Sequence, residues 1–164
     1  MREFPIGRRR LLAGIGVGIA LPVLSACGAE PAQAKDYPFS LSDAQWRRQL
    51  GGERYRILRE AGTEPRFTSG LLHEKRKGTF VCAGCKSPLY SSATKYDSRT
   101  GWPSFWKAIP GAIETSTDTT FGMVRTEARC ATCGSHLGHI FGDGPRPTGK
   151  RHCINGLAME FRPT

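Results

Sequence analysis

The chain has 164 residues, enough for one domain and an appended segment. It is strongly basic, with 24 Lys and Arg against 14 Asp and Glu and a formal net charge of +10. A basic domain suggests nucleic-acid binding, but the cationic residues are scattered and form no dense block interleaved with aromatic residues. The composition therefore argues against a nucleic-acid partner and favours a solvated basic surface.

Residues 1–26 have the pattern of an export signal. Three arginines at 8–10 precede the apolar stretch 11–26, as in a charged n-region followed by an apolar h-region. The arginines followed by two leucines resemble a twin-arginine signal, although Gly7 stands where Ser or Thr is usual. A retained membrane anchor is the alternative, but the apolar stretch is shorter than the roughly 20 residues of a spanning helix. We expect an exported protein that is either periplasmic or anchored on the outer side of the cytoplasmic membrane.

Two cleavage sites compete after this signal. The sequence "LSAC" at 24–27 resembles a lipobox, which would leave Cys27 as an acylated first residue and attach the protein to the membrane. The sequence "AQA" at 32–34 is a small-residue cleavage site. The lipobox is favoured because Cys27 directly follows Leu-Ser-Ala. Residues 27–40 are expected to be a polar tether, and 41–164 the folded domain.

The domain is predicted to begin with two short amphipathic helices. In the first, Ser42 and Gln45 have the spacing of a capping box. Gly51 and Gly52 end this helix, and a second helix, "ERYRILREAG", is expected to end at Gly62. Neither helix contains a candidate catalytic residue.

From about residue 79 the sequence changes to short runs rich in Thr, Val, Phe, Tyr and Ile. Gly, Pro, Asp and Ser interrupt these runs, which predicts strands joined by turns. The sequence therefore predicts a mainly β, antiparallel domain with helices at its N-terminal edge. A domain of this size buries one modest core, which a bound metal would help to hold.

Two CxxC units provide four of the six cysteines, namely Cys82, Cys85, Cys130 and Cys133. A tight turn lets each unit present both sulfurs to one ion, and a pair of such knuckles is typical of structural Zn²⁺. The alternatives are a redox dithiol and disulfides. A redox CxxC normally opens a helix in an α/β context, which neither unit does. We therefore predict a structural zinc site.

Cys153 has no evident partner. If "RHCINGLAMEF" is a strand, Arg151, Cys153 and Asn155 share one face because side chains alternate. The Arg151 cation is expected to lower the pKa of the thiol and to favour the nucleophilic thiolate. An edge-strand cysteine with salt-bridged neighbours fits this fragment equally well.

The residues before Cys153 favour a catalytic role for this cysteine over a structural one. His136, His139 and Asp143 lie in a Gly- and Pro-rich stretch that cannot be a regular helix. The histidines are candidate metal ligands, but four cysteines already fill a tetrahedral shell, which leaves the histidines for acid–base work. In "TGWPSFW", Trp102 and Phe105 taken alone are more typical of a core than of a pocket.

The segments "CAGC", "GWPSF", "CATC", "HLGHIFGDGPRPTGKRHCIN" and "AMEF", in this order, resemble the methionine-R-sulfoxide reductase B family. The resemblance covers residues ~40–162, essentially the whole mature domain. It implies two antiparallel sheets that share a zinc-tied end, a fold called a β-tent, with the zinc away from the active site. The implied activity is reduction of the R epimer of methionine sulfoxide in proteins, and a monomer is expected.

The resemblance also implies roles for single residues. Cys153 is the nucleophile that becomes a sulfenic acid, and His139 is the acid that protonates the oxygen. Trp102 and Phe141 bind the substrate. The remaining candidates shape the site and its charge: His136, Asp143, Arg151 and Asn155.

One position departs from the family. Many members have a resolving cysteine immediately before the Gly-Trp-Pro-Ser-Phe segment, where this chain has Thr100. We therefore expect a one-cysteine cycle in which a thioredoxin-like protein or another external thiol attacks the sulfenic acid. The rival interpretations are a zinc-bearing binding module without catalysis and a basic zinc domain that binds nucleic acid.

Overall fold

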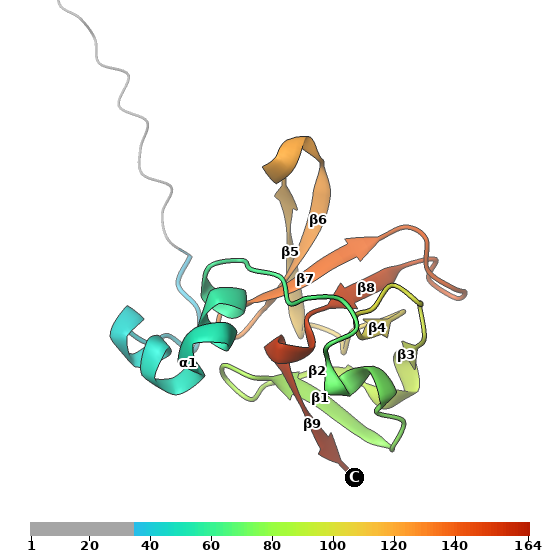
Figure 1. Cartoon of the computed structure of the whole chain (residues 1–164), viewed down its shortest axis with the longest axis horizontal. Helices are drawn as coiled ribbons and strands as arrows, with labels where there is room; N and C mark the ends of the chain where they lie inside the picture. The colour runs from blue at the N-terminus through green and yellow to red at the C-terminus, as the bar shows by residue number, and fades with distance from the viewer. Residues whose placement is uncertain (1–34) are drawn as a thin grey trace, which may run out of the picture. The chain divides into compact units, whose positions relative to one another are not determined.

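The computed structural model describes residues 35–164 (Figure 1). The predicted export signal and Cys27 lie outside these residues. Within them, none of the helices is long and apolar enough to cross a membrane. The final residues of the predicted tether contact the domain, since the Phe39 amide donates to the Thr132 carbonyl over 2.9 Å and the Phe39 and Trp46 rings meet at 5.7 Å.

The helical segment α1 (Asp43–Arg59) is kinked at Gly51, which has a left-handed φ of 69°. This kink separates the two predicted helices, and the predicted capping box of Ser42 and Gln45 is present. The second half ends at Arg59, three residues before the predicted Gly62. The Arg56 carbonyl accepts from the amides of Glu60 and Gly62 at 3.2 and 3.0 Å, so the chain already turns there.

Nine strands form two antiparallel sheets in this part of the chain, which confirms the predicted mainly β fold. The three-stranded sheet has the order β2 (Pro88–Ser91), β1 (Gly78–Cys82), β9 (Met159–Pro163). The six-stranded sheet has the order β3 (Lys95–Tyr96), β4 (Ser104–Phe105), β8 (Arg151–Ile154), β7 (His136–Phe141), β6 (Arg125–Cys130), β5 (Ile113–Asp118). Four 3₁₀ turns connect them: η1 (Gly70–His73), η2 (Ser92–Thr94), η3 (Thr120–Gly122) and η4 (Gly156–Ala158).

The core joins the two sheets through aromatic side chains. Phe105 of β4 stacks on Tyr90 of β2, with ring centroids 4.3 Å apart, and meets Phe80 of β1 edge-on at 5.0 Å. All three are fully buried. Such pairs add to the hydrophobic stabilisation that their burial gives. Phe105 therefore belongs to the core, as its sequence context suggested.

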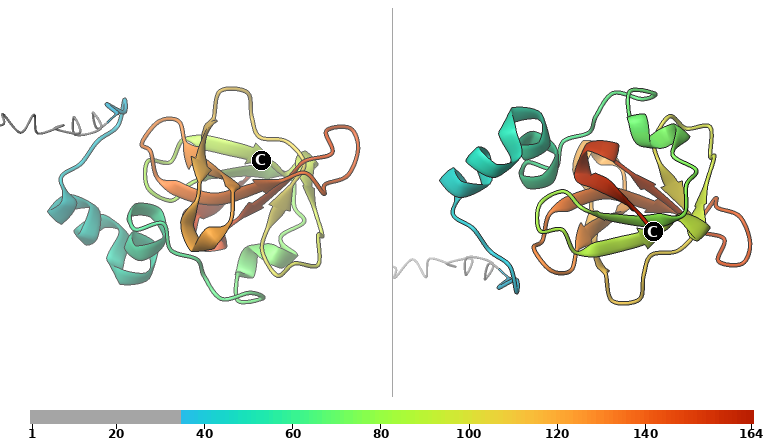
Figure 2. Two further views of the ribbon diagram at one scale, coloured as in Figure 1. Left: turned by 90° about the horizontal axis from the view of Figure 1, so that it is seen from above. Right: turned by 90° about the horizontal axis from the view of Figure 1, so that it is seen from below.

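α1 lies at one end of the domain and the loop between β7 and β8 projects at the other (Figures 1 and 2). The buried face of α1, which includes Trp46, Ile57 and Leu58, packs toward η4 and β7. The chain after β8 is thus held between the helix and the sheet. This placement matters because Cys153 lies on β8.

Candidate functional site

The four CxxC cysteines form one cluster. Cys82 ends β1 in the three-stranded sheet, and Cys130 ends β6 in the six-stranded sheet. Each unit turns back in the same way: the Lys86 amide donates to the Cys82 carbonyl and the Gly134 amide to the Cys130 carbonyl, both over 2.8 Å. Lys86 and Gly134 both have left-handed φ angles, of 64° and 68°. The two turns thereby aim all four sulfurs at one point.

The spacing of the sulfurs fits a tetrahedral metal ion. Sγ atoms are 3.8 Å apart for Cys82 and Cys133, and 3.6 Å for Cys85 and Cys130. All four lie within 4.8 Å of one another. Zn–S bonds of about 2.3 Å in a tetrahedron place sulfurs about 3.8 Å apart, whereas a disulfide needs about 2.05 Å. The cysteines are free thiols, so the disulfide alternative is wrong and a structural metal site fits.

Hydroxyl groups support this cluster. Ser87 Oγ lies 3.3 Å from Cys85 Sγ, and Ser135 Oγ lies 3.2 Å from Cys133 Sγ. Hydrogen bonds from outside the first coordination shell orient metal ligands and tune their charge. Because β1 and β6 belong to different sheets, an ion held here would tie the two sheets together.

Cys153 lies apart from the cluster, in the middle of β8. It pairs in register with Ser104 of β4 on one side and with His139 of β7 on the other. Register partners on antiparallel strands place their side chains on the same face, about 5 Å apart. The strand alternates as predicted, with His152 and Ile154 buried while Arg151 and Cys153 are half-buried. Cys153 and His139 therefore face the same space.

That space is a pocket of about 140 Å³. Five of the predicted site residues line it, joined by three that the sequence did not indicate. The lining residues are Thr63, Trp102, Arg125, Gly138, His139, Phe141, Cys153 and Asn155. A larger hollow of about 660 Å³ beside η1 and β9 is lined by no cysteine or histidine. Chemistry rather than size thus identifies the smaller pocket as the site.

The charge environment of Cys153 differs from the sequence-based expectation. Burial raises the pKa of the thiol above its ordinary value, while the Thr100 hydroxyl and the Arg151 guanidinium lower it by less. Thr100 Oγ1 lies 3.8 Å from Sγ. The prediction that Arg151 would bring the pKa below that of a free thiol is therefore wrong, because desolvation of the anion outweighs the nearby cation. The resting group is a neutral thiol.

Arg151 and Asp143 form a two-point ion pair. Nε and Nη2 of Arg151 donate to the two carboxylate oxygens of Asp143, each over 2.8 Å. The guanidinium also lies 4.3 Å from the centre of the Phe141 ring. The Arg151 side chain is 12 % exposed and that of Asp143 63 %. Asp143 thus holds Arg151 from the solvent side, and the pair fastens the β7–β8 loop to β8.

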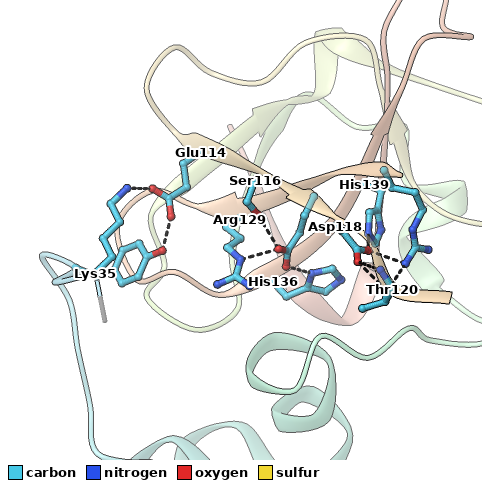
Figure 3. A network of polar contacts seen from close by, with 11 residues as sticks. Lys35, Glu114, Ser116, Asp118, Thr120, Arg129, His136 and His139 are labelled. Carbon is cyan, nitrogen blue, oxygen red and sulfur yellow. Dashed lines mark hydrogen bonds and ion pairs between the residues drawn. The ribbon is translucent and has the colours of Figure 1, made fainter. Parts of the chain in front are cut away.

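His139 is held by the β5–β6 hairpin (Figure 3). Its Nε2 lies 2.7 Å from Asp118 Oδ2, which also accepts from Arg125 Nη2 over 2.6 Å. Burial lowers the pKa of His139 more than Asp118 raises it. The imidazole is therefore neutral near pH 7, and Asp118 fixes its orientation.

His136 lies outside the pocket lining. It is buried, and its Nδ1 is 2.6 Å from Glu127 Oε1. Glu127 also accepts from Ser116 and Arg129. Ser116, Arg129 and His136 are labelled in Figure 3. The His136 ring lies 5.5 Å from that of His139, edge to face. The structure thus places His136 behind His139, where it packs against the imidazole.

A buried carboxylate, Glu64, connects the pocket walls. It is 2 % exposed, and its two oxygens accept from the amides of Gly156 and Leu157 at 2.5 and 3.0 Å. Its backbone N–H donates to Asn155 Oδ1 over 3.0 Å, and its carbonyl accepts from Trp102 Nε1 over 3.1 Å. The Asn155 amide also donates to the Leu137 carbonyl over 3.1 Å. The Asn155 side chain therefore links the backbone at Glu64 to that at Leu137. The Glu64 carboxylate binds the backbone that follows Asn155.

Sequence reasoning missed Thr63, Glu64, Asp118 and Arg125. Each lies in a segment without a motif, and Glu64 reads as an ordinary charged loop residue in "TEPRF". Only its burial and its four hydrogen-bond partners identify it. No signal in a single sequence predicts such contacts, because the partners are distant along the chain.

The fold and the site define a mainly β protein in which a pocket thiol, that of Cys153, stands apart from four thiols whose arrangement fits a structural metal ion. The family model "SelR domain" matches residues 50–163. The chain is 55 % identical over 123 residues to the peptide methionine sulfoxide reductase MsrB of Thiobacillus denitrificans, covering 74 % of this chain and 93 % of that protein. The MsrB of Agrobacterium fabrum is 55 % identical over 123 residues (74 % and 91 %), and that of Leifsonia xyli 51 % over 130 (78 % and 94 %). The chain belongs to the MsrB family of peptide methionine sulfoxide reductases, which are oxidoreductases.

Proposed function

We propose that the protein reduces the R epimer of methionine sulfoxide in oxidised proteins, with Cys153 as the nucleophile. The observation that carries the proposal is the meeting of Cys153, His139 and Trp102 in one pocket, in a chain of this family. A binding module without catalysis would not need a reactive thiol facing a histidine. The basic nucleic-acid domain is not supported either.

The chemistry needs a thiolate and a proton at the same time. The sulfoxide oxygen leaves badly as oxide, so it must be protonated while Cys153 attacks the substrate sulfur. In the resting site the thiol holds its proton and His139 is neutral. His139 accepts the proton from Cys153 and passes it to the sulfoxide oxygen. General acid help of this kind contributes about 10²–10⁴-fold.

The products are methionine and a Cys153 sulfenic acid, the first step of cysteine oxidation. The ring of Trp102 and that of Phe141 form apolar walls for the substrate methyl group. Trp102 is fixed by its hydrogen bond to the Glu64 carbonyl. The apolar walls contact the methyl group on one side of the sulfur, and His139 donates a proton to the oxygen on the other side. This arrangement selects one sulfur epimer.

We assign the metal as Zn²⁺ held by Cys82, Cys85, Cys130 and Cys133. Four thiolates fill a tetrahedral shell and leave no open position, so the ion is structural. The cluster contributes no residue to the Cys153 pocket. Its function is to stabilise the two sheets that carry the site.

We further propose that the protein is exported and functions as a monomer outside the cytoplasmic membrane. The support is the sequence alone: the arginines at 8–10, the apolar stretch 11–26 and the lipobox-like residues before Cys27. Acylation of Cys27 would keep the protein on the membrane. Replacement of Cys27 by Ala is expected to release it into the soluble periplasmic fraction, and an unchanged membrane fraction would contradict the lipid anchor.

The decisive experiment is reduction of the separate R and S epimers of a peptide methionine sulfoxide with dithiothreitol as reductant. We expect activity with the R epimer only, and none after Cys153→Ser. Metal content and far-UV spectra show whether the variant is folded. Activity on the S epimer alone, or activity that survives the substitution, would overturn the proposal.

A further inference from the structure

Exposed apolar side chains lie on two sides of the proposed substrate pocket. Among the described residues, Phe67 is 63 % exposed, Met123 50 % and Val124 82 %. Single exposed apolar residues scattered over a surface are common. These three, however, adjoin residues that line the pocket. Phe67 packs on the residue before Trp102, and Val124 directly precedes Arg125. Both Trp102 and Arg125 are in the pocket lining.

The chain around Phe67 is fixed against the segment that carries Trp102. The Phe67 amide donates to the Gly101 carbonyl over 2.8 Å, and Trp102 Nε1 donates to the Glu64 carbonyl over 3.1 Å. Gly101 has a left-handed φ of 96°, and a Cβ built there would lie 3.1 Å from Phe67 Cδ2. The Phe67 ring therefore lies directly against the backbone that leads into the pocket wall.

The backbone of Phe67 is itself strained. Its φ of 65° lies in the left-handed region, which is rare for a bulky residue. Strained residues persist where surrounding contacts hold them, and they cluster at ligand-binding sites. The Arg66 guanidinium lies 5.5 Å from the centre of the Phe67 ring and 5.6 Å from that of Trp102. These contacts hold an apolar ring in solvent beside the pocket.

Met123 and Val124 lie on the other side of the pocket. They follow η3 at the end of the β5–β6 hairpin, which projects from the rest of the domain (Figure 1). Gly101 precedes β4 and Val124 precedes β6, and the strand order is β4-β8-β7-β6. The strands that carry Cys153 and His139 therefore lie between the two apolar contacts.

The pocket is small for a peptide substrate. Its volume is about 140 Å³, whereas pockets that enclose a drug-sized ligand measure about 300–1,000 Å³. A methionine sulfoxide side chain that reaches Cys153 therefore leaves the peptide backbone and the neighbouring residues outside. Those residues must cross the rim, where the exposed apolar side chains lie.

We propose that Phe67 on one side, and Met123 with Val124 on the other, bind apolar side chains that flank the methionine sulfoxide in an oxidised polypeptide. The inference rests on the proposed function, which places the sulfoxide at Cys153. A polypeptide that crosses the pocket meets one contact before the methionine sulfoxide and the other contact after it. Apolar flanking side chains are favoured because each contact removes apolar surface from water.

The test compares three pentapeptides with a central methionine R-sulfoxide, with dithiothreitol as reductant. Four serines flank the sulfoxide in the reference, and two leucines replace the serines before or after it in the others. Each kcat/KM is divided by that for N-acetylmethionine sulfoxide, which has no flanking residues. Burial of about 40 Å² of apolar surface predicts a roughly fivefold higher ratio for either leucine peptide. We expect the gain in KM, since the contacts lie away from the reacting sulfur.

Two variants should remove the two preferences separately. Phe67→Asn deletes the ring and introduces a residue that tolerates a left-handed backbone, so one leucine peptide should lose its advantage. The double variant Met123→Ser/Val124→Ser should make the other leucine peptide equal to the reference. Phe67→Tyr is the matched control, because it keeps the ring and should retain both preferences.

Equal ratios for all three peptides with the wild-type protein would overturn the inference. Preferences that survive both variants, or a variant that weakens both preferences alike, would do the same. Failure to reduce N-acetylmethionine sulfoxide as well as the peptides would instead defeat the proposed function. The two failures are therefore distinguishable in one set of measurements.

Discussion

The five cysteines of the described chain occupy two environments that differ in how they are built. The metal cluster consists of two turns, each of four residues, whose sulfurs face one another, with three of the four cysteines buried. The Cys153 pocket is assembled from β6, β7, β8 and the loops at residues 63 and 102. Each turn of the cluster forms from neighbouring residues and only the meeting of the two turns is a long-range contact, whereas the pocket depends on several long-range contacts. In the proposed function, the cluster thiols are inert because they hold a metal ion, whereas the Cys153 thiol reacts because it lies in a pocket beside His139.

Removing a thiol from the metal cluster should disrupt folding, whereas removing the Cys153 thiol should abolish activity and leave folding intact. Cys130→Ser in the cluster is expected to abolish metal binding and cooperative folding, because structural zinc contributes about 10–16 kcal/mol to folding in small zinc domains. Cys153→Ser should leave the metal content and the urea unfolding midpoint nearly unchanged and abolish activity. Metal analysis and urea unfolding of both variants measure this. A Cys130→Ser protein that unfolds like the wild type would show that the cluster is not a structural metal site.

The dependence of the pocket on long-range contacts can be tested at Glu64. Glu64→Gln places an amide N–H₂ group against the amides of Gly156 or Leu157, so one buried donor loses its acceptor. We expect destabilisation of about 1–3 kcal/mol and a higher KM for the sulfoxide, since the Trp102 wall and the Asn155 contact share this residue. Glu53→Gln, at a side chain 72 % exposed, is the control. Unchanged stability and KM in Glu64→Gln would show that Glu64 does not stabilise the walls of the pocket.

The smallest expected effect concerns the protonation of Cys153. Because its pKa is raised, alkylation by iodoacetamide should increase with pH over a range above that of a free cysteine. Arg151→Met removes the cation that partly offsets burial, so the pKa should rise further and alkylation at a fixed pH should slow. Arg129→Met, on β6 and paired with Glu127, is the control. If the pH midpoint of alkylation lies below that of free cysteine, burial is not the dominant influence on the pKa of Cys153.

The sequence predicted those parts of the site that depend on local spacing or on an alternating strand. The capping box at Ser42, the two cysteine knuckles and the common face of Arg151 and Cys153 are of this kind. It also predicted that Trp102, Phe141 and Asn155 accompany Cys153, through resemblance to the family. It did not place His136, which binds Glu127 behind His139 and does not line the pocket.

The sequence by itself therefore determined the family, the mainly β architecture and the separation of the four clustered cysteines from Cys153, because each is carried by short motifs of the chain. Only the tertiary structure decided which way the pKa of Cys153 is shifted, that Asp118 orients His139, and that Glu64 joins the pocket walls. Burial and cross-strand contacts govern these properties. Both depend on which distant segments the fold brings against each residue, and no local pattern records them.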